Sequence, residues 1–378
     1  MKFRLSRDVF SDAVQWTSRA VQQRPTIPIL SAVRITAREN EVEFSTFDYE
    51  VSARSKVEAV VTEAGEALVS GRLITEIAKA LPNQDVVLTL NDNHVDVECG
   101  RAKFALQVMP IEDYPDLPTL PTLAGKVDGQ AFSQAVSQVA IATSKDDTLP
   151  LLTGVRVEID GSRITLLATD RYRLALRELE WNPESPSFST EFLVKARVLN
   201  DVARNLGGGG AVDVSLTQGG ATERAAIIGF SAGERQATSS LMDGDYPPVR
   251  KLFPEVTPME YVCARQELLE AVKRVSLVVE RKTPVRLVFE DGALTLDAGA
   301  GESAQAQEAV PLVAAGDPLR TAFNPEYLRD GLASLDTEFV RFGFTDANKA
   351  AVMMGQPEEN GEGDSMFKYL LMPIRFGA

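Results

Sequence analysis

The chain has 378 residues, of which 44% are hydrophobic, and a formal net charge of −15 at pH 7, which suits two or three globular domains of about 100–150 residues each. Its two cysteines, Cys99 and Cys263, lie far apart in the sequence, which argues against a disulfide framework and for a reducing compartment. No stretch approaches the ~20 apolar residues of a membrane span, and no apolar signal region follows Met1, so we expect a cytoplasmic protein without a membrane partner.

A threefold repeat organises the predicted elements along the chain. First helices are predicted around Phe10, Phe132 and Leu268, at spacings of 122 and 136 residues (132 − 10 and 268 − 132). Second helices are predicted over residues 69–81, 194–206 and 323–335. Two families of helices that keep one order, at periods too long for a solenoid of short repeats, predict three similar domains.

Proline clusters mark the boundaries between the repeats. They fall at residues 114–121 and 246–258. Proline restricts its own backbone and that of the preceding residue, so these stretches favour extended connections. We therefore predict domains over residues 1–124, 125–256 and 257–378.

Between the helices, apolar and polar residues alternate, as in Val155-Arg156-Val157-Glu158-Ile159. This alternation is typical of antiparallel strands with one buried face, and turns such as Asp160-Gly161 predict hairpins. The second helices carry apolar stripes, for example Leu73, Ile77 and Leu81. The sequence therefore predicts an α+β fold with two helices and two small antiparallel sheets in each domain.

The polar faces of the second helices carry a repeated basic pair. Arg72 and Lys79 in the first repeat align with Arg197 and Arg204 in the second, two helical turns apart. Such residues are commonplace on solvated helix faces, where acids such as Asp201 can pair with them. Repetition at equivalent positions favours a phosphate-binding surface, and because the Debye length is about 8 Å, acids on an opposite wall would barely oppose it.

An enzyme is a poor alternative. The single histidine, His94, starts a strand with no nucleophile close by in the sequence, and a turn histidine with satisfied ring nitrogens is the simpler interpretation. Gly207–Gly210 follows a helix instead of opening one, so it predicts a helix end and not a phosphate loop. Aspartate pairs at 146–147 and at 243 and 245 lack further carboxylates at coordinating spacing, so we expect no metal and no cofactor.

Five segments, in this order on the threefold repeat, carry a family resemblance: residues 24–30 (RPTIPIL), 168–175 (ATDRYRLA), 245–254 (DYPPVRKLFP), 323–327 (FNPEY) and 371–376 (LMPIRF). With them, the whole chain resembles the bacterial DNA polymerase III β subunits, the sliding clamps that act as processivity factors in DNA replication. The resemblance implies three DNA-clamp domains per chain and a head-to-tail homodimer that forms a ring. Symmetry agrees, because an arc with unlike ends must either close or polymerise.

The function implied by this resemblance is that of a clamp that encircles double-stranded DNA without sequence preference and has no active site. It would tether the replicative DNA polymerase, the clamp loader and repair proteins, which bind through short linear motifs, and so make synthesis processive. The alternative is a non-encircling DNA-binding adaptor protein of the same fold, which predicts no ring closure.

The resemblance also implies three sets of functional residues. For DNA it implicates Arg24, and we extend that set to the other channel-facing basic residues: Arg72, Lys79, Arg197, Arg204, Lys273 and Arg274. The dimer contact would use Phe104, Leu106 and Leu277, although the first two also suit ordinary strand core. A partner-peptide cleft would use Leu152, Thr169, Tyr172, Arg173, Leu174, Pro247, Lys251, Leu252, Asn324, Tyr327, Met372, Pro373 and Arg375, with Arg173 and Arg375 at its rim.

This sequence departs from the family pattern in two places. Glu326 and Ala333 stand where the other second helices have basic residues, so that segment should contribute little to DNA binding. The loop over residues 145–151 lacks the aromatic residues that some relatives place there, which leaves a DNA role for it in doubt. A further acidic loop, residues 356–364, is predicted to be mobile.

Overall fold

A computed structural model describes residues 1–19, 27–217, 227–280, 283–290, 292–299 and 304–374. They form two compact units. The first unit contains residues 1–133, 181–188 and 197–241, and the second contains residues 134–180, 189–196 and the chain from Met242 on. The predicted site residues Arg24 and Arg375 lie outside the described residues.

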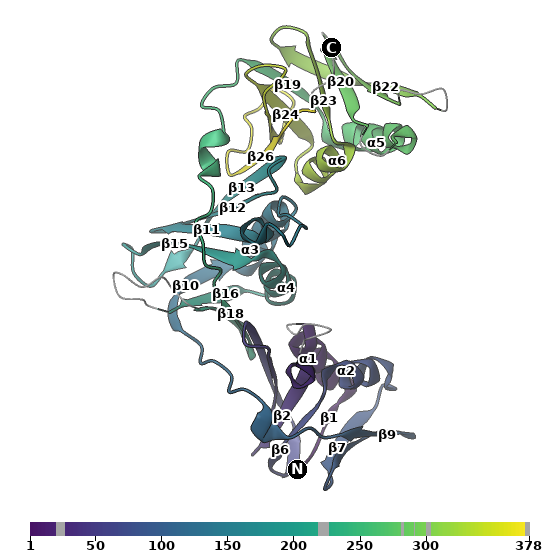
Figure 1. Ribbon diagram of the computed structural model, residues 1–378, viewed down its shortest axis with the longest axis vertical. Coiled ribbons are helices and arrows are strands. Elements are labelled where there is room, and N and C mark those ends of the chain that lie inside the picture. Colours follow the sequence, from purple (N-terminus) through teal and green to yellow (C-terminus); the bar gives the residue numbers. More distant parts are fainter. Residues whose placement is uncertain (20–26, 218–226, 281–282, 291, 300–303, 375–378) are drawn as a thin grey trace. The chain divides into compact units, whose positions relative to one another are not determined.

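The first unit is built from two antiparallel sheets and their covering helices (Figure 1). One sheet has five strands in the order β5-β1-β7-β8-β9, and the other has nine in the order β14-β10-β16-β17-β18-β4-β3-β2-β6. The elements are β1 (Lys2–Ser6), α1 (Arg7–Arg19), β2 (Ala32–Arg38), β3 (Glu41–Phe47), β4 (Val51–Glu58), β5 (Val60–Glu63), β6 (Gly65–Ser70), α2 (Gly71–Ala80), β7 (Asp85–Leu90), β8 (His94–Cys99), β9 (Ala102–Gln107), β10 (Thr122–Asp128), β14 (Asn182–Pro183), α4 (Ala196–Leu206), β16 (Ala211–Leu216), β17 (Ile227–Ala232) and β18 (Arg235–Ser240).

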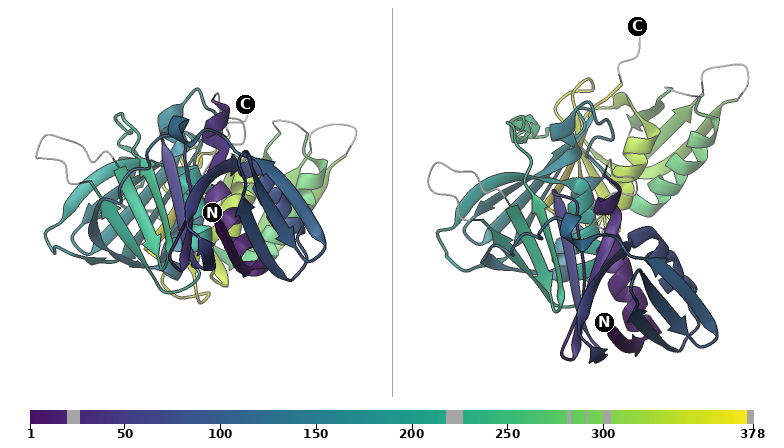
Figure 2. Two further views of the ribbon diagram at one scale, coloured as in Figure 1. Left: turned by 90° about the horizontal axis from the view of Figure 1, so that it is seen from below. Right: turned by 60° about the horizontal axis from the view of Figure 1, so that its bottom comes forward.

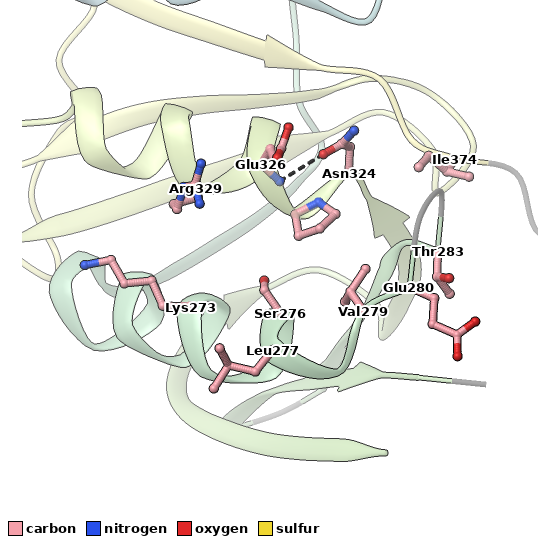
Figure 3. Close-up of a pocket in the computed structure, with 11 residues that line it drawn as sticks. Lys273, Ser276, Leu277, Val279, Glu280, Thr283, Asn324, Glu326, Arg329 and Ile374 are labelled. Carbon is pink, nitrogen blue, oxygen red and sulfur yellow. Dashed lines mark hydrogen bonds between the residues drawn. The ribbon is translucent and has the colours of Figure 1, made fainter. Parts of the chain in front are cut away.

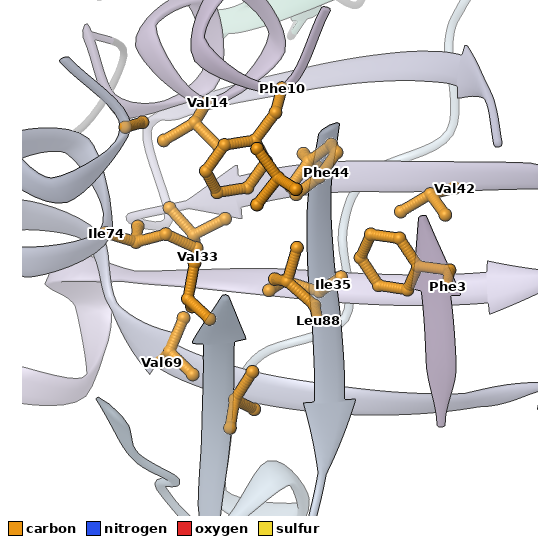
Figure 4. Packing of buried hydrophobic residues seen from close by; sticks show 14 of the residues in the cluster. Phe3, Phe10, Val14, Val33, Ile35, Val42, Phe44, Val69, Ile74 and Leu88 are labelled. Carbon is orange, nitrogen blue, oxygen red and sulfur yellow. The ribbon is translucent and has the colours of Figure 1, made fainter. Parts of the chain in front are cut away.

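The core of this unit lies where α1 and α2 pack on the strands. Phe10 from α1 and Ile74 from α2 point into one apolar cluster with Phe44 and other buried residues (Figure 4). The predicted stripe on α2 is wrong at its first member, because Leu73 is 41% exposed while Ile74 and Ala78 are fully buried. Ser70 caps the helix by accepting a hydrogen bond from the Leu73 amide, and this start sets the helical phase that turns Leu73 outward.

The second unit contains one sheet of twelve strands in the order β15-β11-β12-β13-β26-β25-β24-β19-β22-β21-β20-β23. Helices α5 and α6 lie side by side over it (Figures 1 and 2). The elements are α3 (Gly129–Ala140), which begins in the first unit, β11 (Gly154–Asp160), β12 (Arg163–Thr169), β13 (Arg173–Glu180), β15 (Ser189–Lys195), β19 (Met259–Ala264), α5 (Arg265–Val275), β20 (Val285–Glu290), β21 (Gly292–Ala298), β22 (Ala306–Ala315), β23 (Leu319–Phe323), α6 (Pro325–Ser334), β24 (Phe339–Phe344), β25 (Ala351–Gln356) and β26 (Phe367–Leu371).

Two antiparallel ladders make these sheets longer than the small sheets predicted for each domain. In the first unit β4 of the first repeat pairs with β18 of the second, and in the second unit β13 pairs with β26. An offset of 122 residues superposes β2, β3 and β4 on β11, β12 and β13, for example Val51 on Arg173 (173 − 51 = 122). The chain therefore contains one strand junction twice, once in each unit.

A tyrosine fastens the connection after each of the first two repeats. The Phe47 amide donates a hydrogen bond to the Tyr114 hydroxyl over 2.7 Å, and the Thr169 amide donates to the Tyr246 hydroxyl over 3.0 Å. These tyrosines belong to the repeated Asp-Tyr-Pro motif, so that motif marks the place where the extended connection attaches to its own domain.

The acidic loop over residues 356–364 is held at several points, which corrects the prediction of a mobile segment. Gln356 is fully buried, and its amide group donates hydrogen bonds of 2.7 Å to two loop carbonyls. Arg341 donates to the side chain of Gln356 and to the Gly361 carbonyl, and Arg177 forms an ion pair with Asp364 over 3.1 Å. The loop composition suggested solvation, but buried partners from neighbouring strands fix its backbone.

Candidate functional site

An apolar cluster lies where the connection after β18 crosses the strands of the second unit. Leu174 of β13 faces Leu370 of β26 in the ladder, and both are almost completely buried. Tyr246 and Val249 of the connection cover them. The cluster consists of Leu152, Leu167, Leu174, Leu176, Leu193, Tyr246, Val249 and Leu370.

Large apolar side chains stand exposed around this cluster. Tyr172, Leu252 and Met372 are 55%, 59% and 43% exposed, respectively. The Tyr172 ring stacks on the ring of Tyr327, with centroids 6.3 Å apart, and the Met372 amide donates a hydrogen bond to the Tyr172 carbonyl over 2.9 Å. We call the exposed residues Tyr172, Lys251, Leu252 and Met372 the β13–β26 surface.

Arg173 lies beneath this surface and not at its rim, which corrects the predicted position. Its side chain is 5% exposed and forms ion pairs with Asp170 over 3.0 Å and with Asp330 over 2.8 Å. The guanidinium also lies over the Tyr327 ring, 4.3 Å from the centroid, and donates to the Tyr369 hydroxyl over 3.4 Å. A buried arginine is tolerated here because two carboxylates, a hydroxyl and an aromatic face surround it.

The buried network shifts the pKa values of its members. Burial alone lowers the pKa of Arg173, but Tyr369, Asp330 and Asp170 outweigh it and raise that pKa above the ordinary value. Burial raises the pKa of Tyr369, and Arg173 opposes that rise. At neutral pH the arginine is charged and the tyrosine is a neutral hydrogen-bonding group, so the network is fixed in one protonation state.

The structure brings twelve of the predicted cleft residues into the second unit. Leu152, Thr169 and Leu174 are buried beneath the surface, while Pro247 and Lys251 are exposed on the connection. Asn324 caps α6 by accepting hydrogen bonds from the amides of Glu326 and Tyr327. Sequence reasoning missed Asp330, whose only signal was its position one helical turn after the Phe-Asn-Pro-Glu-Tyr segment.

A pocket of about 570 Å³ adjoins Asn324, between the end of α5 and the start of α6 (Figure 3). Lys273 and Arg329 lie at one end of it, and Ile374 and Thr283 lie at the other. Arg329 places a cation on α6 beside the positions where Glu326 and Ala333 had suggested none, so the prediction that this helix contributes little positive charge is incomplete.

The repeated basic pairs lie on the exposed faces of α2 and α4, in the first unit. Arg72 and Lys79 are exposed, and no ion pair joins either to another described residue. Arg197 lies 3.9 Å from Asp201, the pairing that the solvated-face interpretation expected, and Arg204 is exposed. On α5, Lys273 pairs with Glu270 and Arg274 forms a two-pronged ion pair with Glu308 of β22.

The three residues predicted for a dimer contact differ in exposure. Leu277, just after α5, is 85% exposed. Phe104 is 37% exposed on β9, which is an edge strand and pairs only with β8 within the described residues. Leu106 on the same strand is 4% exposed and packs into the core of the first unit, as the strand-core alternative expected.

The described residues offer little to support metal or acid–base chemistry. Within them, no group of three or more His, Cys, Asp or Glu side chains is arranged to hold a metal ion. His94 interacts with Asn93 over 2.9 Å and with Asp96 over 3.3 Å, as a turn histidine with satisfied ring nitrogens does. None of the described helices is long and apolar enough to cross a membrane.

Comparison with protein families matches nearly the whole chain. The DNA polymerase III beta subunit N-terminal domain matches residues 1–118, the central domain matches residues 126–248 and the C-terminal domain matches residues 250–375.

Curated relatives and solved structures agree with these matches. The beta sliding clamp of Streptomyces coelicolor is 46% identical over 375 residues, covering 99% of both chains, and that of Micrococcus luteus is 50% identical over 311 residues, covering 82% of this chain and 99% of that protein. The structure of the Pseudomonas aeruginosa DnaN sliding clamp bound to griselimycin aligns over both whole chains with a TM-score of 0.90 at 27% identity. The Bacillus subtilis DNA polymerase sliding clamp aligns equally completely, with a TM-score of 0.89 at 26% identity.

Proposed function

Because the chain belongs to the family of DNA polymerase III beta subunits, the beta sliding clamps, we propose that two copies of it close head to tail into a ring around duplex DNA. The chain is a DNA sliding clamp, and clamps of this family are processivity factors without catalytic activity of their own. Such a ring keeps a bound polymerase at high effective concentration on the template.

The repeated strand junction carries the proposal of closure. In each unit, the third strand of one repeat pairs with the last strand of the next repeat, as β4 pairs with β18 and β13 with β26. The same rule leaves β22 of the third repeat and β9 of the first as the remaining complementary pair. Within the described residues β9 has one free edge, and β22 has a free edge over 306–312 because β19 covers only Val313–Ala315. Unlike ends of this kind join copies head to tail.

The rule also gives a register for the contact between copies. Strand β9 superposes on β18 at an offset of 133 residues (235 − 102), which makes Phe104 the equivalent of Ala237. Ala237 pairs with Ala53 of β4. The position of Ala53 is taken by Ala175 in β13 and by Ala306 in β22, so we propose that Phe104 of one copy faces Ala306 of the other.

The surroundings of Ala306 suit an incoming aromatic ring. Glu308, two residues on and therefore on the same face of β22, is paired with Arg274 of α5, so this face of the strand lies toward α5. Leu277 follows that helix and is 85% exposed, which offers apolar area for Phe104. Leu106 would contribute its edge backbone to the ladder while its side chain stays in its own core.

Directed crosslinking tests both the ring and the register. Residues that face each other in an antiparallel ladder have Cα atoms about 4.5–5.5 Å apart, within the range that a disulfide spans. A Phe104→Cys, Ala306→Cys variant should form covalent dimers on oxidation, whereas Phe104→Cys with Gln307→Cys, which points to the opposite face, should not. A wild-type chain that remains monomeric at micromolar concentration would refute the ring, and crosslinking of the control alone would refute the register.

We further propose that partner proteins insert short linear motifs onto the β13–β26 surface. The exposed Tyr172, Leu252 and Met372 offer apolar area to Leu or Phe anchors, and Asn324, Tyr327, Pro247, Pro373 and Arg375 complete the predicted cleft. A labelled, net-neutral ten-residue peptide with Leu and Phe anchors should bind the wild type, and replacing Met372 and Pro373 by Ala should abolish binding without dissociating the dimer. Dissociation of the dimer by this double change would show that the cleft is misplaced.

For the DNA contact we propose the basic residues of α2, α4 and α5, together with Arg24. Arg72, Lys79 and Arg204 are exposed, whereas Lys273 and Arg274 share their charge with acids and should contribute less. Such contacts act on phosphates and carry no sequence preference. We also propose a cytoplasmic location and retain the domain boundaries near residues 124 and 256.

A further inference from the structure

The connection between β18 and β19 forms one wall of the proposed cleft, and three attachments hold it against the sheet. The Thr169 amide donates to the Tyr246 hydroxyl, and Val249 is buried in the apolar cluster. The third attachment is Arg250, which donates to Glu158 of β11 over 2.9 Å and to Glu178 of β13 over 2.7 Å. Lys251 and Leu252, the next two residues, belong to the β13–β26 surface.

The arginine contacts form a small network on the solvent-facing side of the strands. The side chains of Glu158 and Glu178 are only 22% and 16% exposed, and each has a second arginine, Arg156 at 2.8 Å and Arg163 at 3.4 Å. Isolated surface ion pairs contribute little, but forked arginine contacts within a network are the arrangement in which they do count. Arg250 is the only one of these three arginines that belongs to the connection.

The other strand junction has the same connection without this fork. Tyr114 is the equivalent of Tyr246 and makes the same hydrogen bond, at an offset of 132 residues (246 − 114). At that offset Arg250 corresponds to Pro118, which has no side-chain donor, and the two glutamates correspond to Thr36 and Lys56. The fork is therefore present only at the junction that carries the proposed cleft.

We infer that Arg250 is a positioning residue of the partner-peptide cleft: by fixing the short helical turn Val249–Leu252 on β11 and β13, it sets the place of Lys251 and Leu252 before a peptide arrives. Pre-organisation of a wall lowers the ordering cost of binding. The inference rests on the proposed function, because it assumes that this surface takes peptides.

The test compares Arg250→Gln with Arg163→Gln in the full chain, using the same labelled, net-neutral peptide. Arg163 contacts the same Glu178 and loses the same charge, but it lies on β12 and not on the connection. Arg250→Gln should weaken peptide binding about fivefold, which is the scale of a partly exposed ion-pair network, while Arg163→Gln binds like the wild type. Amide hydrogen exchange over residues 249–253 should rise only in Arg250→Gln, and Arg250→Lys should restore part of the affinity.

A double-mutant cycle separates positioning from a general loss of charge. In a chain that carries Glu158→Gln and Glu178→Gln, the further change Arg250→Gln should have no additional effect on affinity. Wild-type affinity in Arg250→Gln, with binding abolished in the Met372 and Pro373 double variant, would overturn the inference and leave the cleft intact. Absence of peptide binding by the wild type would instead overturn the proposed cleft.

Discussion

The junction of β4 with β18 and the junction of β13 with β26 share a backbone plan but differ in the side chains that face each other across the ladder. In the first unit Ser52 faces Thr238, and their hydroxyls are hydrogen bonded over 2.6 Å. In the second unit the equivalent residues are Leu174 and Leu370. A buried hydroxyl pair satisfies itself and offers nothing to a ligand, whereas a leucine pair provides the floor of an apolar cluster.

The charged residues of the two junctions differ in one member. The helix acids are common to both, since Asp201 of α4 corresponds to Asp330 of α6 at an offset of 129 residues (330 − 201). Arg173, which pairs with Asp330, corresponds to Val51. Asp201 instead has Arg197 on its own helix at 3.9 Å. The repeat thus provides two places where a cleft could form, and a few substitutions make one of them a binding surface.

The largest expected effect comes from removing the charge that only one junction has. Arg173→Leu leaves Asp170 and Asp330 without their buried partner, and breaking a buried ion pair on one side costs about 3–5 kcal/mol. Hydrogen exchange of the β13–β26 amides should report this loss, with the β4–β18 amides unchanged. Equal losses in both ladders would contradict the view that the two junctions are stabilised separately.

A matched pair of truncations tests the apolar floor. Leu370→Ala should cost about 2–5 kcal/mol, because a fully buried leucine leaves a cavity. Thr238→Ala at the equivalent position should cost about 1–2 kcal/mol, mainly for the Ser52 hydroxyl that loses its partner. Peptide binding should fall only with Leu370→Ala. A loss of peptide binding with Thr238→Ala would show that the first junction also contributes to recognition.

The smallest expected effect is one that both junctions share. Burial raises the pKa of Tyr114 and of Tyr246 to about 12, above the ordinary tyrosine value of about 10. Each therefore contributes stability that is fully present below pH ~10 and is lost as pH rises toward ~12. Tyr114→Phe and Tyr246→Phe should each flatten the fall in stability over this window to a similar degree, as measured by denaturant titration at several pH values. A change confined to one of them would break the equivalence.

Local patterns in the sequence predicted much of this fold. The helix positions, the alternating strands and the threefold repeat follow from periodicities that depend on neighbouring residues. The joining of small sheets into sheets of nine and twelve strands could not be predicted, because edge-to-edge pairing of β4 with β18 leaves no signal within either strand. The phase of α2 was mispredicted because Leu73 and Ile74 are both apolar, and only the Ser70 cap decides which faces the core.

The candidate site was predictable where family motifs carry it and not where its energy lies in contacts between distant segments. Tyr172 and Met372 stood in recognisable motifs, but the burial of Arg173 depends on Asp330, 157 residues away. The ties that hold the acidic loop come in the same way from Arg177 and Arg341 on other strands.

The central claim is that the chain holds DNA by encirclement. The direct measurement is retention on nicked circular plasmid after loading by a clamp loader, compared with retention after a restriction enzyme has linearised the plasmid. The account predicts stable retention on the circle and rapid loss on linearisation, because nothing but topology holds the ring. Equal retention on circular and linear DNA would mean a direct grip on the duplex and would favour a non-encircling adaptor.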